Sequence, residues 1–428
     1  KEKSLMANDF SSNFTRQLAR VFLEKFDSER VLSKNVNTQL LQGKFNPATG
    51  DNVDFKRPTD YVSVRTATGD VSGETADPII TGKATGTVQP YFTSFVDYDE
   101  ADEALKMDQL DQLLAPMATR LKTDFELDFA DFMMKNTGLV AGTVGTGVTK
   151  WDHIAEAGSL LASTGVPQDG GWCYAVNPYT QRALASEQRS LGVNPEVSSA
   201  NSRATIAENF AGMKVMSATT LSTYTTGTGA DRVGAIVSSA PTATYSAARN
   251  TMTQSIQVTG FQANLVVAAG ETLTVTGRNR LNLSTRKLIL DETGASILFS
   301  GTVTSSVTLN GSGVGTLVIT GPAIFEATGA YNTVDSALAI GDVVTLGGAA
   351  SKVIQPNMFW NKQAFSVGSV PIKKLYSTDT VATTEDGLQF RISRGSSFLN
   401  NEQKVRIDFR PAYGVMNPFF AGQGFGRA

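Results

Sequence analysis

The sequence predicts an α+β protein in which a framework of helices and strands is interrupted by an all-β domain. Two helical patterns indicate the framework, one near the N-terminus and one through residues 103–136. Residues 221–350 instead break into short alternating runs separated by glycines, and only 13 of these 130 residues are charged, against 64 of the other 298. This abrupt change in composition predicts one domain inserted into another.

Length and net charge narrow the domain number and the classes of protein to which the chain can belong. A chain of 428 residues is long enough for two or three domains. The net charge of -3 and the pI near 5.5 disfavour a dedicated polynucleotide binder, because no overall positive field attracts phosphate. No apolar run approaches the roughly 18 residues of a membrane helix, and no signal-peptide pattern opens the chain, so we expect a soluble, unsecreted protein.

An amphipathic helix is predicted over residues 10–26. Apolar side chains recur there at every fourth position, with basic residues on the other faces, and Asp9 or Ser11 is placed to cap the start. The apolar stripe is buried either in the core of the chain itself or on a neighbouring subunit, and the sequence leaves both open. The stripe consists of Phe10, Phe14, Leu18, Phe22 and Phe26.

Residues 43–98 predict an extended arm of two long strands joined by a turn-rich tip. Within it, the stretch "DFKRPTDYVSVRTATGDVSG" holds Lys56, Arg57 and Arg65, which suit either phosphate binding or contacts between subunits. The acidic balance of the chain disfavours phosphate. Because an isolated two-stranded arm is marginally stable in water, we expect it to lie on another surface.

A long helix is predicted from Glu103, with its second part over residues 117–136 and with Pro116 either kinking it or opening that part. Asp124, Asp128 and Asp131 share one face at i, i+4 and i+7, which suits a metal site. Basic residues extend the same face by four positions at each end, so an ion-paired face is the favoured interpretation. These basic residues are Arg120 and Lys135.

Shorter elements follow in an α/β order. We predict a helix from Trp151 to Leu161 ending near Gly165, a strand "WCYAV", a helix opened by Asn177 and Pro178 that runs to about Arg189, and a strand "MKVMSA". The runs "SIQVTG", "ETLTVTG", "KLILDE", "SILFSGTVT", "SVTLN", "TLVITG" and "DVVTLGG" then predict a β-barrel or sandwich within 221–350.

No constellation of residues indicates catalysis, a metal or a cofactor. The "ITGKATG" stretch lacks the first glycine and the Ser or Thr of a phosphate loop, and "AGTVGTG" and "GSGVGTL" lack the dinucleotide-binding order. The single histidine, His153, is expected at the surface or as a helix cap, and the single cysteine, Cys173, in the core. One cysteine also excludes an intramolecular disulfide.

The order of these elements resembles the major capsid protein of tailed phages, with the Hong Kong 97-type fold, and more closely the coat proteins of short-tailed phages of the Lederbergvirus type. The residues that support this lie mostly outside the β-rich segment. They are "FKRP" at 55–58, "GKATG" at 82–86, "LAPMATRLKTDFELDFADFMMKN" at 114–136, "KW" at 150–151, "YAVNP" at 174–178, "PNMFWNKQAFSVGSVPIKKL" at 356–375 and "PAYGVMNPFFAGQGFG" at 411–426.

The resemblance implies a division of the chain and a function. The parts would be an N-terminal arm (1–42), an E-loop with flanking strands (43–98), a P-domain spine helix region (99–150), a first A-domain part (151–220), a β-barrel insertion domain (221–350) and an A-domain and P-domain return (351–428). The implied function is that of a non-enzymatic coat protein. Copies of it would self-assemble in the host cytoplasm into the hexamers and pentamers of an icosahedral virion capsid.

The resemblance also implies a scaffolding protein, a portal and enclosed double-stranded DNA as partners, without a membrane. Two alternatives remain at this stage: an encapsulin-type compartment shell, and a β-rich adhesin or tail protein. The residues expected at contacts between subunits are Phe14, Leu18, Phe22, Lys56, Arg57, Arg65, Asp70, Arg120, Asp124 and Asp128.

Overall fold

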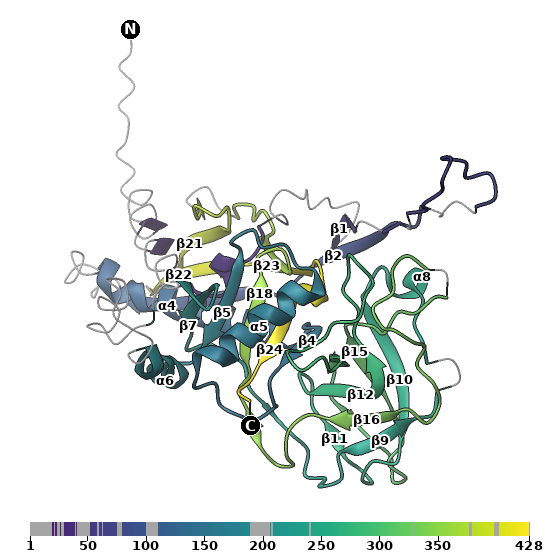
Figure 1. The fold of residues 1–428 in the computed structure, drawn as a ribbon. Coiled ribbons are helices and arrows are strands. Elements are labelled where there is room, and N and C mark those ends of the chain that lie inside the picture. The colour runs from purple at the N-terminus through teal and green to yellow at the C-terminus, as the bar shows by residue number, and fades with distance from the viewer. Residues whose placement is uncertain are drawn as a thin grey trace. The chain divides into compact units, whose positions relative to one another are not determined.

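The structure is a computed structural model that describes most of the chain, as two compact units. The first unit comprises Lys1–Val53, Gly86–Phe129 and Ser366–Gly414, and the second comprises Asp54–Thr85, Ala130–Phe365 and Val415–Ala428. The described residues are all except 1–18, 21, 24–25, 27–29, 39, 41–51, 58–59, 62, 75–78, 100–109, 189–205, 207–208, 239–240, 328, 376–378, 398–401 and 428. Helices and strands occur together, so the predicted combination of α and β structure in one chain is confirmed (Figure 1).

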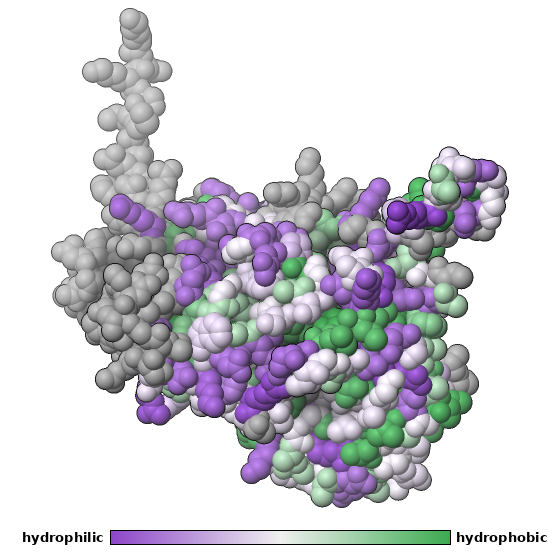
Figure 2. All heavy atoms as spheres, viewed as in Figure 1, coloured by the Kyte–Doolittle hydropathy of each residue, from purple (hydrophilic) through white to green (hydrophobic). Residues whose placement is uncertain are grey.

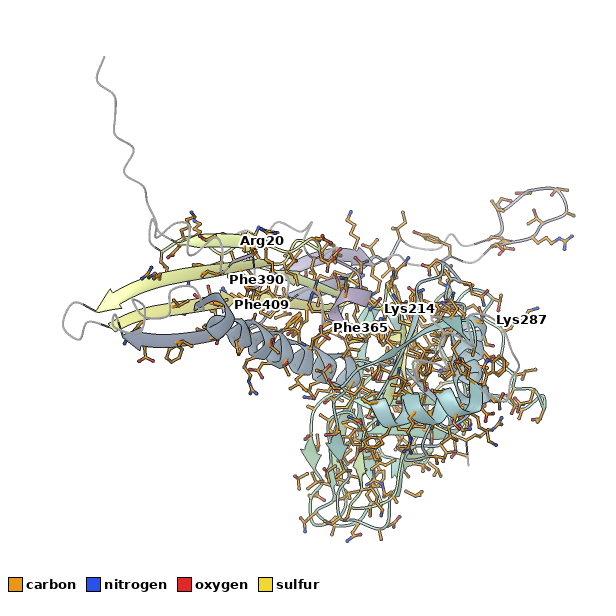
Figure 3. The ribbon with its side chains drawn as sticks, turned by 90° about the vertical axis from the view of Figure 1, so that its left-hand side faces the viewer. Arg20, Lys214, Lys287, Phe365, Phe390 and Phe409 are labelled. Carbon is orange, nitrogen blue, oxygen red and sulfur yellow. The ribbon has the colours of Figure 1, made fainter. Side chains whose placement is uncertain are left out.

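The first unit is built on one antiparallel sheet and a helix. The sheet has the order β20 (Thr380–Thr383), β21 (Gln389–Ser397), β22 (Glu402–Phe409) and β3 (Phe92–Asp99). Strand alternation directs Phe390, Ile392, Val405, Ile407 and Phe409 into the core, where all five are buried. Phe390 and Phe409, labelled in Figure 3, stack with ring centroids 4.5 Å apart.

Helix α4 (Leu110–Lys135) is the predicted long helix, and it runs through Pro116 as one element. Its buried stripe includes Phe125, whose ring centroid lies 5.0 Å from that of Phe409 in the first unit. The helix passes into the second unit at Ala130. The predicted start near Glu103 lies outside the described residues.

The N-terminal stripe packs into the same aromatic core. Phe22 is 1% exposed and its ring lies 4.9 Å from Phe390, while Phe26 is 0% exposed and lies 4.6 Å from Phe390. The expectation that Phe22 contacts another subunit is therefore wrong, because the chain itself buries the ring. Phe14 and Leu18 lie outside the described residues.

A second four-stranded sheet has the order β1 (Asn52–Arg57), β2 (Gly82–Val88), β23 (Pro411–Val415) and β19 (Phe365–Ser369). The predicted pair of strands in the arm is confirmed by the neighbouring β1 and β2. The segment also holds β3, which belongs to the other sheet, since Gln89 and Pro90 interrupt the extended run. A short 3-10 helix, η1 (Ser33–Asn35), precedes the arm.

The second unit has a mixed six-stranded sheet in the order β4 (Leu139–Ala141), β24 (Ala421–Gly424), β18 (Asn357–Asn361), β5 (Trp172–Val176), β7 (Met213–Ser217) and β6 (Asn209–Phe210). The predicted helices are α5 (Trp151–Thr164) and α6 (Pro178–Gln188). Gly165 ends α5 with a left-handed φ of 93°, and the Asn177 side chain accepts the Thr180 N–H at the start of α6.

A closed barrel of six strands lies between residues 233 and 346. Its order is β10 (Thr253–Thr259), β15 (Gly315–Thr320), β13 (Leu298–Val303), β12 (Thr272–Asn279), β16 (Val343–Leu346) and β9 (Val233–Ile236). Buried aliphatic side chains from every strand fill it, together with Phe299. The predicted run "KLILDE" is not a strand and forms only single bridges, such as Leu290 with Ser296.

Smaller elements complete the second unit. They are β8 (Tyr224–Thr225) paired with β17 (Val353–Ile354), β11 (Val266–Val267) paired with β14 (Val307–Thr308), α8 (Tyr245–Ala248) and η3 (Pro418–Phe420). None of the helices in the described part of the chain has the length and apolar content needed to cross a membrane.

Candidate inter-subunit surface

The base of the arm is held by a polar cluster across β1 and β2. The carboxylate of Asp54 accepts hydrogen bonds from Lys83 Nζ at 2.8 Å and Thr85 Oγ1 at 2.6 Å. The bond from Lys83 is the main reason that the pKa of Asp54 lies below its usual value. The motif "GKATG" thus binds a carboxylate of its own chain through Lys83. A phosphate loop would need this lysine to bind phosphate.

Arg57 lies in the interior of the second unit, with 6% of its surface exposed. Its guanidinium donates to three backbone carbonyls: Arg249 at 2.7 Å, Met416 at 3.2 Å and Val415 at 3.3 Å. Burial lowers its pKa from the usual value. The expectation that Arg57 contacts another subunit is therefore wrong, because these contacts within the chain occupy the side chain.

The tip of the arm, residues 61–79 as far as the structure describes them, has the opposite character. Arg65 and Asp70 are exposed, and the Asp70 carboxylate accepts the backbone N–H of Ser72 at 2.9 Å, a bond that lowers the pKa of Asp70. Figure 2 shows hydrophobic and hydrophilic surface mixed on the arm. The exposed apolar residues are Tyr61 at 53%, Val64 at 48%, Val71 at 57% and Ile79 at 79%.

Lys56 is exposed on β1, next to the buried Arg57. Alternation along the strand explains this difference, since successive side chains point to opposite faces. Of the three basic residues that the sequence grouped in this stretch, Lys56 and Arg65 thus stay available for contacts with another molecule.

The acidic face of α4 is ion-paired, as predicted. Arg120 Nε donates to Asp124 at 3.0 Å, and Lys135 pairs with Asp131. Asp128 instead accepts the Tyr413 hydroxyl at 2.9 Å, and burial together with this carboxylate raises the pKa of Tyr413. Within the part of the chain that the structure describes, no group of three potential ligands is placed to hold a metal ion.

The single histidine and the single cysteine are both buried. His153 does not occupy the N-cap of α5, which is Lys150, but its Nδ1 accepts the Thr149 N–H at 3.2 Å just before the helix. The predicted surface position is wrong, since His153 is 6% exposed. Cys173 is a core residue as predicted, and burial raises the pKa of its thiol to about 11.

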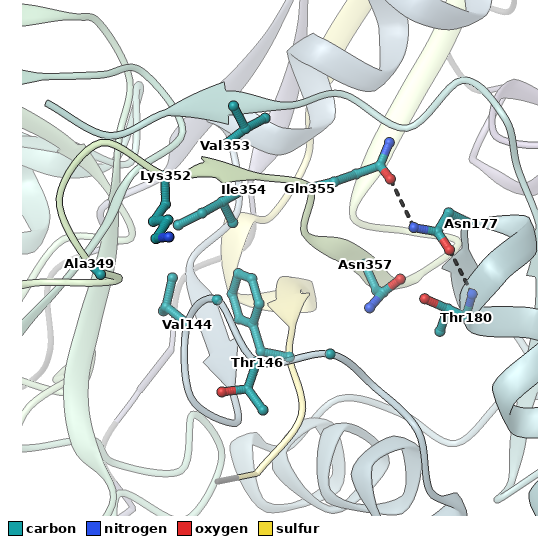
Figure 4. A pocket seen from close by; sticks show the side chains of 13 residues that line it. Val144, Thr146, Asn177, Thr180, Ala349, Lys352, Val353, Ile354, Gln355 and Asn357 are labelled. Atoms are coloured by element: carbon teal, nitrogen blue, oxygen red, sulfur yellow. Dashed lines mark hydrogen bonds between the residues drawn. The ribbon is translucent and has the colours of Figure 1, made fainter.

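A cavity of about 470 Å³ lies beside the start of α6, where the glycine-rich loop of residues 144–147 faces β17 (Figure 4). The Asn177 amide donates to Gln355 at 2.9 Å at its edge. Among the described residues that line it, Lys352 is the single one with a charged side chain. The loop "AGTVGTG", which did not fit a nucleotide motif, thus forms part of a polar wall.

The sequence analysis missed several buried polar residues, two of which connect distant segments of the chain. Glu126, on the apolar stripe of α4, accepts the backbone N–H groups of Leu32 at 2.9 Å and Ser33 at 3.1 Å, and so holds η1. Its signal was a carboxylate between Phe125 and Phe129, on a face that should be apolar.

The other of these two residues is Arg280, which is 1% exposed. It donates to the carbonyl oxygens of Gly138 at 2.8 Å and Ser300 at 2.7 Å, and burial lowers its pKa to about 10. It therefore connects the barrel to the segment that follows α4. Nothing in its sequence neighbourhood distinguishes it from Arg278 and Arg286 nearby, which are only partly buried.

Comparison with known proteins gives the class of this molecule. A family model described as "P22 coat protein - gene protein 5" matches residues 6–426. A "Major capsid protein" of Acyrthosiphon pisum secondary endosymbiont phage 1 is 34% identical over 427 residues, covering 98% of this chain and all of that relative. The class is thus a phage coat protein.

The chain belongs to the P22 coat protein family, and it is a major capsid protein of a phage. This sets aside the encapsulin-type shell and the adhesin or tail protein. Among solved structures, Mycobacterium phage Che8 has a TM-score of 0.44 at 13% identity, covering 92% of this chain and 90% of that one. The capsid of Cyanophage P-SCSP1u has a TM-score of 0.43 at 11% identity, covering 89% and 84%.

Proposed function

We propose that this coat protein assembles with copies of itself into an icosahedral shell of hexamers and pentamers around double-stranded DNA, and that the tip of the arm contacts a neighbouring copy. The proposed contact between the arm and a neighbouring copy is supported by a group of exposed apolar side chains on one projecting segment. They are Tyr61, Val64, Val71 and Ile79. Exposed apolar side chains that gather on one feature mark an interaction site. Lys56, Arg65 and Asp70 on the same arm supply charges for pairing.

The framework is proposed to be the Hong Kong 97-type fold, with α4 as the spine helix and the barrel as the insertion domain. The helix-and-strand order and the closed barrel between residues 233 and 346 support this assignment. Arg120, Asp124 and Asp128 on α4 are further proposed contacts, through the ionic groups that this face presents. Such contacts are weak singly, at about 0–1 kcal/mol each, and repetition around a shell makes them sufficient.

The remaining partners follow from the proposed role. A scaffolding protein would guide assembly in the host cytoplasm, and a portal would occupy one vertex. The near-neutral charge of the chain agrees with a shell that encloses DNA without sequence-specific binding. We infer no enzymatic activity and no cofactor, since a shell requires neither.

Electron microscopy and sedimentation of the purified chain test the function. Closed shells are expected, alone or with a scaffolding protein. Fibres, or monomers that no scaffolding protein converts into shells, would contradict it. A separate test expresses residues 221–350 alone. Dispersed amide NMR signals are expected, because all the described residues of the barrel's buried cluster lie within 236–346. Collapsed signals would contradict an autonomous insert.

A further inference from the structure

The base of the arm lies against the loops of the barrel segment, within the second unit. Arg57 Nη1 donates to the carbonyl oxygen of Arg249 at 2.7 Å, and the backbone N–H of Lys83 donates to Asn250 Oδ1 at 3.3 Å. Gly82 is close enough that a Cβ atom there would lie 2.4 Å from the Arg249 oxygen. Both strands of the arm therefore contact Arg249, and β2 also contacts Asn250. These two residues directly follow α8.

An ion pair holds the chain where it leaves β1. Arg286 Nη2 lies 2.5 Å from Asp60 Oδ2, with side chains 21% and 38% exposed. Arg286 is itself held in place, since Nη1 donates to the Asn332 carbonyl at 2.8 Å and the guanidinium lies 4.8 Å from the centre of the Tyr331 ring. A guanidinium held by these two groups is preorganised, so less side-chain entropy is lost when it binds a carboxylate.

An apolar contact completes the arrangement at the other strand. Ile80 packs against the cluster of Tyr245, Met252, Ile324 and Phe419, which Tyr331 also joins. The Tyr245 and Tyr331 rings lie 4.4 Å apart, and Tyr331 lies beneath Arg286. The polar and apolar contacts of the arm thus share one surface.

We propose that Arg249, Asn250, Arg286, Tyr331 and Asn332 form a socket that fixes the base of the arm in the unassembled chain, with Arg286 and Arg57 as positioning residues. A two-stranded arm is marginally stable by itself, and fixing its base presents the tip in one direction before a neighbour arrives. The barrel segment then contributes to assembly by fixing the base of the arm of the same chain. This inference rests on the proposed contact between the tip and a neighbouring copy.

Hydrogen exchange of the unassembled full-length chain tests the socket directly. Arg286→Ala is expected to speed exchange of the amides of residues 79–85 by about fivefold, which corresponds to about 1 kcal/mol. Asp60→Ala should also speed exchange there, and the double variant should exchange more slowly than the sum of the two single effects predicts, because the two side chains share the ion pair. Arg278→Ala is the matched control: it breaks a 2.7 Å ion pair with Asp342 in the barrel segment.

The control should leave residues 79–85 unchanged. Additive effects of Asp60→Ala and Arg286→Ala, or faster exchange throughout the chain, would overturn the socket, because a general loss of stability does not single out the arm. The rate of shell formation tests whether the socket positions the arm for assembly. Slower assembly of Arg286→Ala at unchanged global stability supports positioning, and a normal rate refutes it. Failure of the unaltered chain to form shells would refute the proposed function, while the exchange result would still decide the socket.

Discussion

The base and the tip of the arm differ in how the chain uses the same residue types. At the base, Arg57 is 6% exposed and bonds three carbonyls of its own chain, whereas Arg65 at the tip is exposed. Ile80 packs into an apolar cluster, whereas Ile79 beside it is 79% exposed. A single projecting element thus combines a part that belongs to the fold with a part left free for another molecule. Substitutions at matched positions separate the two.

The largest effect is expected from Arg57→Ala. The substitution removes the donors of three carbonyl groups in the interior, and each buried acceptor left without a partner costs free energy of unfolding. We expect a loss of about 2–4 kcal/mol, measured by urea unfolding of the unassembled chain. The stretch that was assigned to assembly would then prove to be part of the fold.

Arg65→Ala is the control for Arg57→Ala. It should change the free energy of unfolding by less than about 0.5 kcal/mol, as is usual for an exposed side chain. Equal losses from the two substitutions would contradict the distinction between base and tip.

The neighbouring isoleucines give a sharper comparison with a smaller effect. Ile80→Ala removes apolar contacts with the cluster around Tyr245, and we expect a loss of about 1–2 kcal/mol because Ile80 is only partly buried. Ile79→Ala, with the same change in volume, should be within about 0.5 kcal/mol of the unaltered chain. Thermal unfolding of both variants checks this, and a larger loss at Ile79 would invert the assignment.

A still smaller effect concerns pH. The pKa of Asp54 is lower in the folded chain than in the unfolded one, so its contribution to stability is present above about pH 4 and is lost as pH falls through the folded pKa. Because the pair with Lys83 is about half exposed, we expect only about 0.2–1 kcal/mol. Asp54→Asn should therefore destabilise the chain in urea at pH 6 but not at pH 2. An equal loss at both values would show that ionisation of Asp54 is not the cause.

Much of the framework follows from local patterns. The stripe that predicts α4, the glycine that ends α5 and the alternating runs of the barrel all act over a few residues, so the sequence alone displays them. "KLILDE" shows the limit. Its alternation suits a strand, but Leu288 and Leu290 form only single bridges, and both are left exposed.

The long-range contacts could not be predicted. Lys56, Arg57 and Arg65 look alike in sequence, and what distinguishes Arg57 is the arrival of carbonyls from residues 249, 415 and 416. For the same reason, the sequence did not show which residues cover the apolar stripe that contains Phe22. Phe390, which packs against Phe22, is 368 positions away along the chain. Periodicity predicts that a face is buried, but it does not say by what.

The smallest effect on stability, and the one that decides the role of the tip, is expected from Arg65→Glu and Ile79→Asp. Both side chains are exposed, so the free energy of unfolding should stay within about 0.5 kcal/mol of the unaltered chain. Shell yield in sedimentation should fall for both, since one change reverses a charge and the other places a carboxylate in an apolar contact. Exposed Val353→Asp, on β17, serves as the matched control away from the arm. Normal yields from both tip variants with unchanged circular dichroism would remove the tip from the contacts between subunits, and the arm would then be an element of the fold alone.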